Sequence, residues 1–460
     1  MGVVARGLID PIVAPGEFSP HLHTVKGASG ISLNSSVDDL LASSCTSCQI
    51  SQDKSAYWTP QLYFYDNNTN TYEMVQEVSG HLTYYKYVPH FISSGTYVYP
   101  IAIPNGMKML SGNPFRRNMT IPRPDPPRPW TGADATQDAL HQKAIGFNCL
   151  NYAGTPEGTL ERHFLPDKNF LETNCPDGIR LEVLFPTCWD GVHLTSDDLT
   201  SHLAYGDAGA NGGNCPKGYD TVIMQLLFET IYPTGNNIGR TGYYVFSNGD
   251  PTGFGYHGDA LIAWEGTTLE DAVKVCGDPV KGPYATDGVV EHCPVFKMVA
   301  PAAQSACAIQ ASQVAVHADF QAMATALPGN NPIQTGPQEA SQLDSAAAIT
   351  PIPTLPSDLV PTTQSVAPRT SNTADPYGNQ FLQGTAISYA GPAVTPAPVA
   401  SELPKGEHIL STMTYTSNGA VYEIVDVEVF STTTIWGNVP RSVALDRRAR
   451  HLGRHVRHSH

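Results

Sequence analysis

The sequence is poor in charge and has no long apolar run. Only 15% of its 460 residues are charged, and no stretch of about 18 apolar residues occurs, so no transmembrane helix is predicted. The formal net charge is −16, whereas surfaces that bind nucleic acid are basic. We therefore expect no membrane span and no nucleic-acid partner.

Other features are also absent. The opening residues MGVVARGLIDPIV contain no apolar core of the length that a secretory signal needs. Because the C-terminus is basic and a lipid-anchor signal ends in an apolar tail, we expect no such anchor. A single C-x-x-C pair, Cys45–Cys48, is present. A zinc ribbon needs two such pairs, so none is predicted.

The nine cysteines are scattered along the first 307 residues, often beside turn residues. This pattern is typical of disulfides formed in an oxidising compartment. We expect at least three disulfides, and the odd count leaves at least one cysteine without a partner in the chain. Asn34, Asn67 and Asn118 begin N-glycosylation triplets. Together these features predict a secreted glycoprotein whose signal peptide is missing from this chain, either truncated or removed.

Residues 1–300 have the pattern of one disulfide-bonded β domain. The composition is rich in Gly and Pro, with 40 and 38 residues. Runs rich in Tyr, Val, Ile, Phe and Thr alternate with turn residues. One helix is predicted over 267–277. We expect an all-β, two-sheet sandwich, jelly-roll-like, with long loops and a disordered C-terminal extension. The strand-like runs lie at 57–66, 74–88, 95–103, 178–186, 221–232, 241–250 and 257–265.

The composition changes after residue 300. Residues 301–408 are rich in Ala, Ser, Thr and Pro and predict a linker, with a short helix near its start. Residues 409–440 are strand-prone, and the SNG triplet inside them predicts a hairpin turn. Residues 441–460 form a basic, His-rich tail. We expect this tail to be disordered, with contact to a wall polyanion or a metal as the alternative.

Four blocks of the sequence occur together in a known family. They resemble a large family of secreted fungal proteins catalogued as a domain of unknown function, often joined to carbohydrate-binding WSC modules. The resemblance covers residues 6–297 and implies secretion, disulfides and association with cell walls or polysaccharides, without an established reaction. This chain shows no WSC module. The blocks are IDPIVAPGEFSPHLHTVKGAS, SCTSCQISQDKSAYWTPQLYF, NCPDGIRLEVLFPTCWDGVHL followed by HLAY, and NGDPTGFGYHGDALIAWE.

The segment FPTCWDG, residues 185–191, permits two interpretations. In the structural one, Cys188 fixes a strand end and Asp190 makes a turn with Gly191. In the functional one, Trp189 offers a flat face to a sugar ring while Asp190 accepts a hydroxyl. Trp58 and Trp264 are further candidates for such a platform, although core packing explains a tryptophan equally well.

The segment GYHGDALIAW is the second candidate. His257 and Asp259 are two residues apart, so on a strand both side chains point to one face. A histidine beside a carboxylate suits a general base or a metal ligand. Gly255 and Gly258 would let a ligand approach the backbone. The alternative is a turn of hydrogen-bonded polar residues.

His21 and His23 are also two residues apart and precede a glycine-rich stretch. In an extended segment both imidazoles would project to one side, as two metal ligands require. Catalysis, substrate hydrogen bonding and a purely structural role are the alternatives. We predict that both histidines line one concave face together with His257 and Asp259, with Asp190 and Trp189 close by.

Three functions remain open, and the sequence does not decide whether the protein is an enzyme. A secreted wall-associated enzyme that cleaves polysaccharide would use Asp190 and Asp259 as acid and base if it is a hydrolase, with Glu229 as substitute. A lyase would use His257 and Tyr256. The second function is non-catalytic binding of wall glycan, and the third is a His-liganded metal protein. We name His257, Asp259, Asp190 and His21 as catalytic candidates, and Trp189, Trp58, His23 and Tyr256 as substrate-binding candidates; no metal ligand and no cofactor is assigned.

Overall fold

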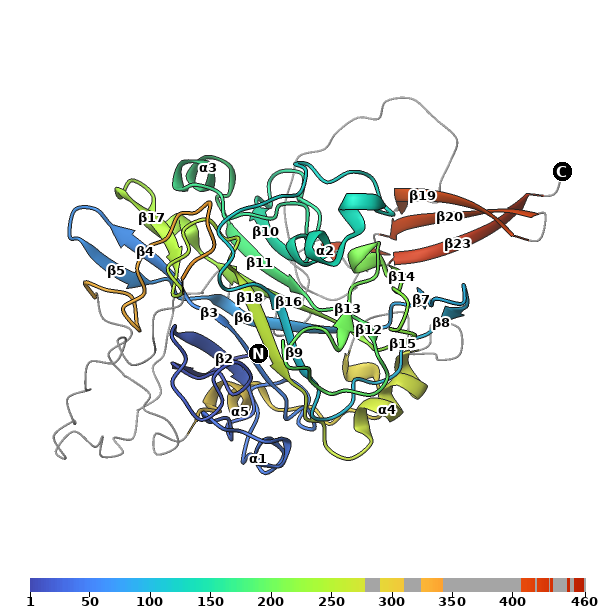
Figure 1. The fold of residues 1–460 in the computed structure, drawn as a ribbon, viewed down its shortest axis with the longest axis horizontal. Coiled ribbons are helices and arrows are strands. Elements are labelled where there is room, and N and C mark those ends of the chain that lie inside the picture. The colour runs from blue at the N-terminus through green and yellow to red at the C-terminus, as the bar shows by residue number, and fades with distance from the viewer. Residues whose placement is uncertain are drawn as a thin grey trace, which may run out of the picture. The chain divides into compact units, whose positions relative to one another are not determined.

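The computed structural model describes residues 1–277, 290–309 and 324–341, and the backbone of strands between residues 407 and 458. Two antiparallel sheets form the first part of the chain, as the sequence predicts (Figure 1). The five-stranded sheet has the order β1 (Val3–Gly7), β2 (His23–Gly27), β3 (Ala56–Pro60), β18 (His257–Leu261), β9 (Lys108–Gly112). The four-stranded sheet has the order β10 (Ile145–Leu150), β11 (Gly178–Leu184), β16 (Gln225–Tyr232), β6 (Val78–Lys86).

The main core lies between these two sheets. Tyr57 of the first sheet packs edge-to-face on Phe228 of the second, with ring centroids 5.6 Å apart. Gly258 sits so close to the second sheet that a Cβ there would meet Phe228 at 3.1 Å and Val183 at 3.2 Å. Side chains alternate between the two faces of a strand, so Tyr57 of β3 and Gly258 of β18 face the four-stranded sheet. Their neighbours in β3 and β18 lie on the outer face of the five-stranded sheet.

The outer face of the five-stranded sheet is buried too. Val25 and Trp58 belong to a second apolar cluster there, together with Ile9 and Ile12 from the loop after β1 and Leu40 from helix α1 (Val37–Leu41). Strands β2, β3 and β18 are consequently buried at every position. A strand covered on both faces lacks the polar–apolar alternation of a half-exposed strand, which makes β2 hard to recognise in the sequence.

Small sheets and short helices complete this part of the chain. Helix α4 (Thr268–Ala272) begins where the sequence predicts a helix, with Thr267 as its N-cap residue. Helix α3 (Lys168–Asn174) packs against β10 and β17 (Figure 1). The other elements are β4 (Leu62–Asp66), β5 (Thr71–Met74) and β17 (Gly242–Phe246) in one sheet, β12 (Cys188–Trp189), β13 (Leu203–Ala204) and β15 (Thr221–Val222) in a second, β7 (His90–Phe91), β8 (Tyr97–Val98) and β14 (Gly213–Asn214) in a third, and helices α2 (Gln137–Lys143) and α5 (Pro301–Ala306).

Four disulfides confirm the prediction of at least three. The pairs are Cys45–Cys307, Cys149–Cys175, Cys188–Cys215 and Cys276–Cys293. Cys48 is the free, buried cysteine. Such a set suggests an extracellular protein, because the cytosol keeps thiols reduced. Among the residues described, no helix has both the length and the apolar character needed to cross a membrane.

Residues 324–341 pack on the first part of the chain, which corrects the expectation that all of 301–408 is a linker. Their backbone and side chains bond to it at several points, including Asn331 Nδ2 to the Pro20 carbonyl at 2.7 Å. Helix α5 lies at the predicted start of that region. The rest of the expected linker, residues 310–323 and 342–406, falls outside the described residues.

The strands after residue 407 belong to a separate unit. β19 (Glu407–Ser417) and β20 (Ala420–Val429) pair antiparallel with Ser417 opposite Ala420, the arrangement that a hairpin at SNG requires. β23 (His451–His458) pairs with β20. This stretch of the basic tail is thus a strand where a disordered tail was expected. β21 (Ser431–Thr432) and β22 (Leu445–Asp446) form a further pair.

A polar cluster links the two large sheets inside the main core. The Tyr57 hydroxyl donates to Asp53 Oδ2 at 2.8 Å and lies 2.7 Å from the Tyr85 hydroxyl of β6. Trp264 Nε1 donates to Tyr85 at 3.1 Å. Burial raises the pKa of Asp53 to about 6. The folded protein therefore holds a proton on Asp53 at a pH where the unfolded chain has already lost it.

This cluster predicts a pH-dependent effect of Asp53→Asn. Because the pKa of Asp53 is raised by folding, its contribution to stability is fully present below about pH 4 and is lost as the pH rises towards 6, a loss of roughly 2–3 kcal/mol. Asparagine keeps the acceptor for Ser55 N and cannot ionise. Urea unfolding of the wild type and the variant is measured at pH 4, 5, 6 and 7. The free energy of unfolding of Asp53→Asn should rise relative to that of the wild type as the pH increases through this range. A constant difference at every pH would contradict the assignment.

Candidate metal centre

Three histidines converge on the outer face of the five-stranded sheet. The register places His23 of β2 opposite Pro60 of β3. His257 of β18 lies opposite Gly112 of β9, and Asp259 lies opposite Trp58 of β3. His23 and His257 therefore occupy one row across the sheet, on the two sides of Pro60. His21, two residues before His23, belongs to the loop that leads into β2.

The Nε2 atoms of these histidines meet at short distances. His21 Nε2 and His257 Nε2 are 3.1 Å apart, and His23 Nε2 and His257 Nε2 are 3.5 Å apart. A tetrahedral ion with metal–nitrogen bonds of about 2.0–2.1 Å separates its ligand nitrogens by about 3.3 Å. The observed spacing is thus close to that of a three-histidine metal site, and the three side chains form a group able to hold an ion.

Backbone carbonyls behind two of the rings fix which nitrogen carries the proton. His23 Nδ1 lies 2.9 Å from the Ile9 carbonyl, and His257 Nδ1 lies 2.9 Å from the Gly255 carbonyl. A carbonyl oxygen only accepts, so each Nδ1 must be the N–H donor and each neutral ring presents a lone pair at Nε2. Those two lone pairs face each other whichever tautomer His21 adopts. A bound cation would make this contact favourable.

Burial keeps the three rings neutral. Their exposed fractions are 6% for His21, 0% for His23 and 2% for His257. Burial lowers the pKa of His21 and of His23 well below the usual value, and the neighbouring histidines lower both further. Burial also lowers the pKa of His257, to about 4. Near neutral pH all three side chains are uncharged, which is the form that binds a metal.

Two carboxylates lie next to His23. A second group of buried potential ligands consists of Asp10, His23 and Asp259. Their ligand atoms, one from each side chain, all lie within 4.8 Å of one another. Asp10 Oδ1 accepts the backbone N–H groups of Ile12 and Val13. Both side-chain oxygens of Asp259 are buried without a hydrogen-bond partner. Burial, followed by the charge of Asp10, raises the pKa of Asp259 well above its usual value.

A small cavity adjoins the three-histidine group. It measures about 40 Å³, which is room for about three water molecules. His21, His257 and Asp10 contribute to its wall beside Arg117 and Asn248. Residues 331–341 close another part of it, through Asn331, Gln334, Ala340 and Ser341. Segments far apart in the sequence therefore enclose one space beside His21 and His257.

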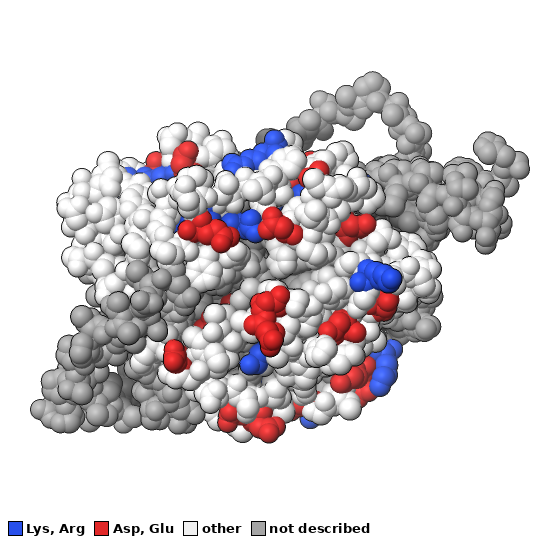
Figure 2. Space-filling view, in the orientation of Figure 1, with Lys and Arg blue, Asp and Glu red and all other residues white. Residues whose placement is uncertain are grey.

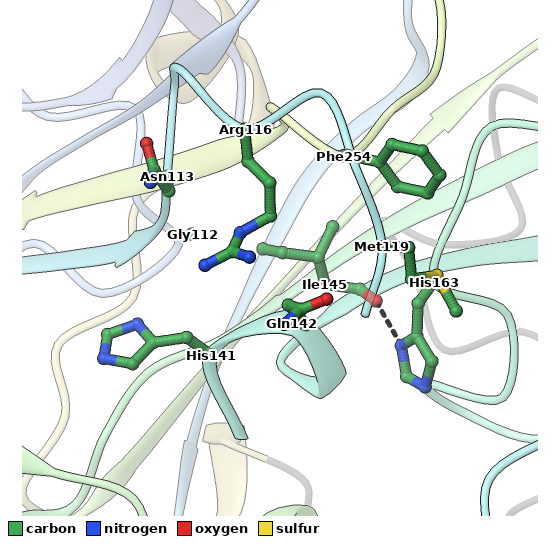
Figure 3. Close-up of a pocket in the computed structure, with 9 residues that line it drawn as sticks. All are labelled: Gly112, Asn113, Arg116, Met119, His141, Gln142, Ile145, His163 and Phe254. Carbon is green, nitrogen blue, oxygen red and sulfur yellow. Dashed lines mark hydrogen bonds between the residues drawn. The ribbon is translucent and has the colours of Figure 1, made fainter. Parts of the chain in front are cut away.

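A second, smaller cavity is lined in part by Gly112, the residue paired with His257 (Figure 3). It measures about 10 Å³ and is lined by Arg116, His141 and His163, among others. The dashed line in Figure 3 marks the contact between His163 Nδ1 and the Ile145 carbonyl, 2.7 Å long. The cavity has room for about one water molecule, so we do not treat it as a ligand site.

Comparison with known proteins identifies the family. Residues 10–264 match the model of a family described as a domain of unknown function, DUF1996. The chain belongs to the DUF1996 family. No curated protein and no solved structure matches it. The DUF1996 match contains all five residues of the histidine and carboxylate groups, whereas residues 331–341 of the cavity wall lie beyond its end.

The DUF1996 domain does not bring Asp190 to the histidines, which corrects the expected neighbourhood. Asp190 N donates to the His202 carbonyl, and His202 Nε2 contacts the Lys108 carbonyl. Lys108 and Gly112 are the two ends of β9, roughly 13 Å apart along the strand. Asp190 Oδ2 instead binds His193 Nδ1 at 2.6 Å and closes a turn. This is the structural interpretation of FPTCWDG, because the described hydrogen bonds of the Asp190 side chain all close this turn.

The tryptophans are buried, so the expectation of a sugar platform at Trp189, Trp58 and Trp264 is wrong for this structure. Trp58 is 0% exposed and Trp264 is 2% exposed. Trp189 is buried and its Nε1 donates to the His193 carbonyl. A sugar ring needs an exposed aromatic face on which to stack, and the sequence alone does not distinguish such a face from core packing.

Tyr256 and Glu229 also lie away from the histidine group. Tyr256 is buried in the main core, with its ring 4.9 Å from that of Phe246. Glu229 of β16 contacts Tyr84 and Arg180. Neither side chain has a described contact with the three histidines. Tyr256 is therefore not placed to assist a lyase at the histidine group, and Glu229 is not placed to assist a hydrolase there.

The glycines beside His257 serve packing, which corrects the idea that they admit a ligand. A Cβ on Gly255 would meet Arg117 Nη1 at 2.4 Å, and Gly258 faces the second sheet. Two residues that matter for the site had no sequence signal. Asp10 lies in an irregular loop, and Arg117 follows Arg116 in another loop and donates its guanidinium N–H to the Asn248 carbonyl at 2.8 Å.

Proposed function

We propose that this DUF1996 protein is an extracellular metal-binding protein that holds one transition-metal ion through the Nε2 atoms of His21, His23 and His257. One observation carries the proposal: two Nε2 lone pairs, oriented by backbone carbonyls on the far side of each ring, face each other at 3.5 Å beside a third Nε2. This is the third of the functions that the sequence left open, and it is the one that the geometry favours.

The donor set indicates the class of metal. Three neutral imidazoles suit Zn²⁺, Cu²⁺, Fe²⁺ or Ni²⁺ better than Mg²⁺ or Ca²⁺, which prefer oxygen ligands. Three protein ligands leave a coordination position, and two of the three histidines line the cavity. Three histidines with an open position are the arrangement of catalytic rather than structural zinc sites. A metal there would act as a Lewis acid towards a molecule in the cavity.

The size of the cavity limits what reaches this position. A volume of about 40 Å³ admits a few water-sized molecules, whereas pockets that bind larger ligands measure about 300 Å³ or more. A polysaccharide chain is far larger than this space. We therefore favour small-molecule chemistry or metal storage at the histidines over cleavage of a glycan there.

An extracellular location is supported by two sets of residues. The first is the set of four disulfides. The second is the three N-glycosylation triplets, because Asn34, Asn67 and Asn118 are all exposed, as the attachment of a glycan requires. Acidic side chains are spread over the face seen in Figure 2, with fewer basic ones among them. Such a surface attracts cations from the surroundings.

Metal titration of the full chain tests the proposal. Because the tail is rich in histidine, we would use a background in which His451, His455, His458 and His460 are replaced by Asn. That protein should bind one equivalent of Zn²⁺ or Co²⁺ by calorimetry, and excess Zn²⁺ should raise its unfolding free energy, by about 2.7 kcal/mol at 100 times the Kd.

Three single variants, His21→Gln, His23→Gln and His257→Gln, should each weaken Zn²⁺ binding by more than about 100-fold, since even residues that only orient a ligand cost 10–100-fold. His163→Gln is the matched control, because His163 is buried and bonds to a backbone carbonyl elsewhere in the domain. Its Zn²⁺ affinity should equal that of the background protein. Wild-type-like binding in all three cluster variants would refute the metal function.

Binding of wall glycan is a second candidate function, at another place. Phe91, Tyr97 and Tyr99 are 42%, 50% and 44% exposed, and Tyr97 lies 4.9 Å from Phe91 and 5.8 Å from Tyr99 between ring centroids. Adjacent exposed rings suit stacking on the apolar faces of sugars. The resemblance to secreted, wall-associated fungal proteins supports the same idea.

Co-sedimentation with insoluble chitin and β-glucan tests this second function. The double variant Phe91→Ala/Tyr99→Ala should lower the bound fraction by about 10-fold, because each ring supplies stacking energy of the order of 1 kcal/mol. Val192→Ala is the control, since Val192 is an exposed apolar residue in another loop. Equal sedimentation of both variants and the wild type would exclude the exposed rings of Phe91, Tyr97 and Tyr99 as a glycan site.

A further inference from the structure

The carboxylate of Asp259 has no explanation in the proposed three-histidine site. The side chain is fully buried, and neither of its oxygens has a hydrogen-bond partner. A buried carboxylate without donors is strongly disfavoured unless a proton or a cation compensates it. Asp10 lies beside it, with Oδ1 fixed by two backbone N–H groups and the Trp58 side chain close to the carboxylate. Two buried carboxylates thus meet next to His23.

We propose that Asp10, His23 and Asp259 form a second cation position beside the three-histidine site, suited to a divalent ion that prefers carboxylate ligands, such as Mn²⁺. The observation behind it is the convergence of their three ligand atoms within 4.8 Å, with both oxygens of Asp259 unpartnered. The inference rests on the proposed metal function, because His23 belongs to both groups.

His23 makes the two positions alternatives. Its Nδ1 donates to the Ile9 carbonyl, so only the Nε2 lone pair remains for a metal. One lone pair coordinates one ion at a time. The domain therefore holds a single ion, and the chemistry of that ion selects the position: imidazole-preferring ions such as Zn²⁺ bind at the three histidines, and carboxylate-preferring ions bind at Asp10, His23 and Asp259.

Charge favours the same division. The three-histidine position brings no negative charge, because its ligands are neutral imidazoles. The second position brings two carboxylates, whose charges balance those of a divalent ion without any other group. Asp259 and His257 stand two residues apart on one face of β18. A short displacement along this strand therefore changes the donor set from nitrogen only to mainly oxygen.

A crossover of affinities tests the inference in the full chain with the four tail histidines replaced. Mn²⁺ binding is followed by the electron paramagnetic resonance signal of the free aqua ion, and Zn²⁺ binding by calorimetry. Asp259→Asn, which preserves shape and removes the charge, should weaken Mn²⁺ by more than about 10-fold and change Zn²⁺ by less than about 3-fold. His257→Gln should do the reverse, and His23→Gln should weaken both ions.

Asp53→Asn is the matched control, because Asp53 is a buried carboxylate on the inner side of the same sheet. It should leave both affinities unchanged. In the background protein, one equivalent of Zn²⁺ should displace all bound Mn²⁺. Near-ultraviolet circular dichroism of each variant reports whether it is folded, and His257→Ala replaces His257→Gln should the latter not fold.

Each outcome bears on one proposal. Unchanged Mn²⁺ affinity in Asp259→Asn overturns the second position and leaves the three-histidine site standing. Simultaneous binding of one Mn²⁺ and one Zn²⁺ overturns the claim that the two positions share His23 and exclude each other. Zn²⁺ binding that is insensitive to His257→Gln overturns the three-histidine site, while a loss of Mn²⁺ in Asp259→Asn still supports the carboxylate position. The two failures are therefore distinguishable.

Discussion

The arrangement described here depends on two imidazole rings held from behind by backbone carbonyls. Ile9 and Gly255 each accept the Nδ1 proton of one histidine, and this directs the opposite nitrogens of His23 and His257 at each other. A proton on His21 Nε2 would reach His257 Nε2 at 3.1 Å, while His23 Nε2 would still face His257 Nε2 at 3.5 Å. A protein interior tolerates such an arrangement when a further group completes it, and a metal ion is the group whose geometry fits the observed spacing.

The strand register sets this contact up. His23 and His257 come from β2 and β18, which are separated by β3, so the two rings approach each other across the row that contains Pro60. The five-stranded sheet is buried on both faces: its inner face packs on the second sheet, and its outer face carries the histidines and the carboxylates under the loop after β1. Rigid strands therefore carry two of the three histidines, which favours a fixed geometry over an adaptable one.

The sequence predicted local features better than long-range ones. Turn-bounded runs of β-branched and aromatic residues identified five of the nine strands in the two large sheets and missed β1, β2, β9 and β10. The spacing of two between His257 and Asp259 correctly placed both on one face. Disulfides followed from the scattered cysteines. The strand runs and the spacing are properties of neighbouring residues, and elementary stereochemistry determines them. The disulfides were predicted without their pairing, which joins residues up to 262 positions apart.

Features that depend on distant contacts were missed. The pairing of His21 with His257 joins residues 236 positions apart, and no local pattern encodes the register that brings them together. The burial of Trp58 and the isolation of Asp190 depend on the same long-range packing. Asp10 escaped notice because its role arises from a loop without periodic pattern. Sequence reasoning consequently predicted that the three histidines and Asp259 lie together, and it added Asp190 and Trp189, whose hydrogen bonds go elsewhere.

Crystallography of the Zn²⁺-loaded protein tests the central claim most directly. Anomalous difference maps recorded on the two sides of the zinc absorption edge locate the ion without assumptions about its ligands. The account predicts one strong peak about 2.0–2.1 Å from the Nε2 atoms of His21, His23 and His257. Zinc found only at surface histidines or at the chain's His-rich end, with no peak between the three rings, would contradict it.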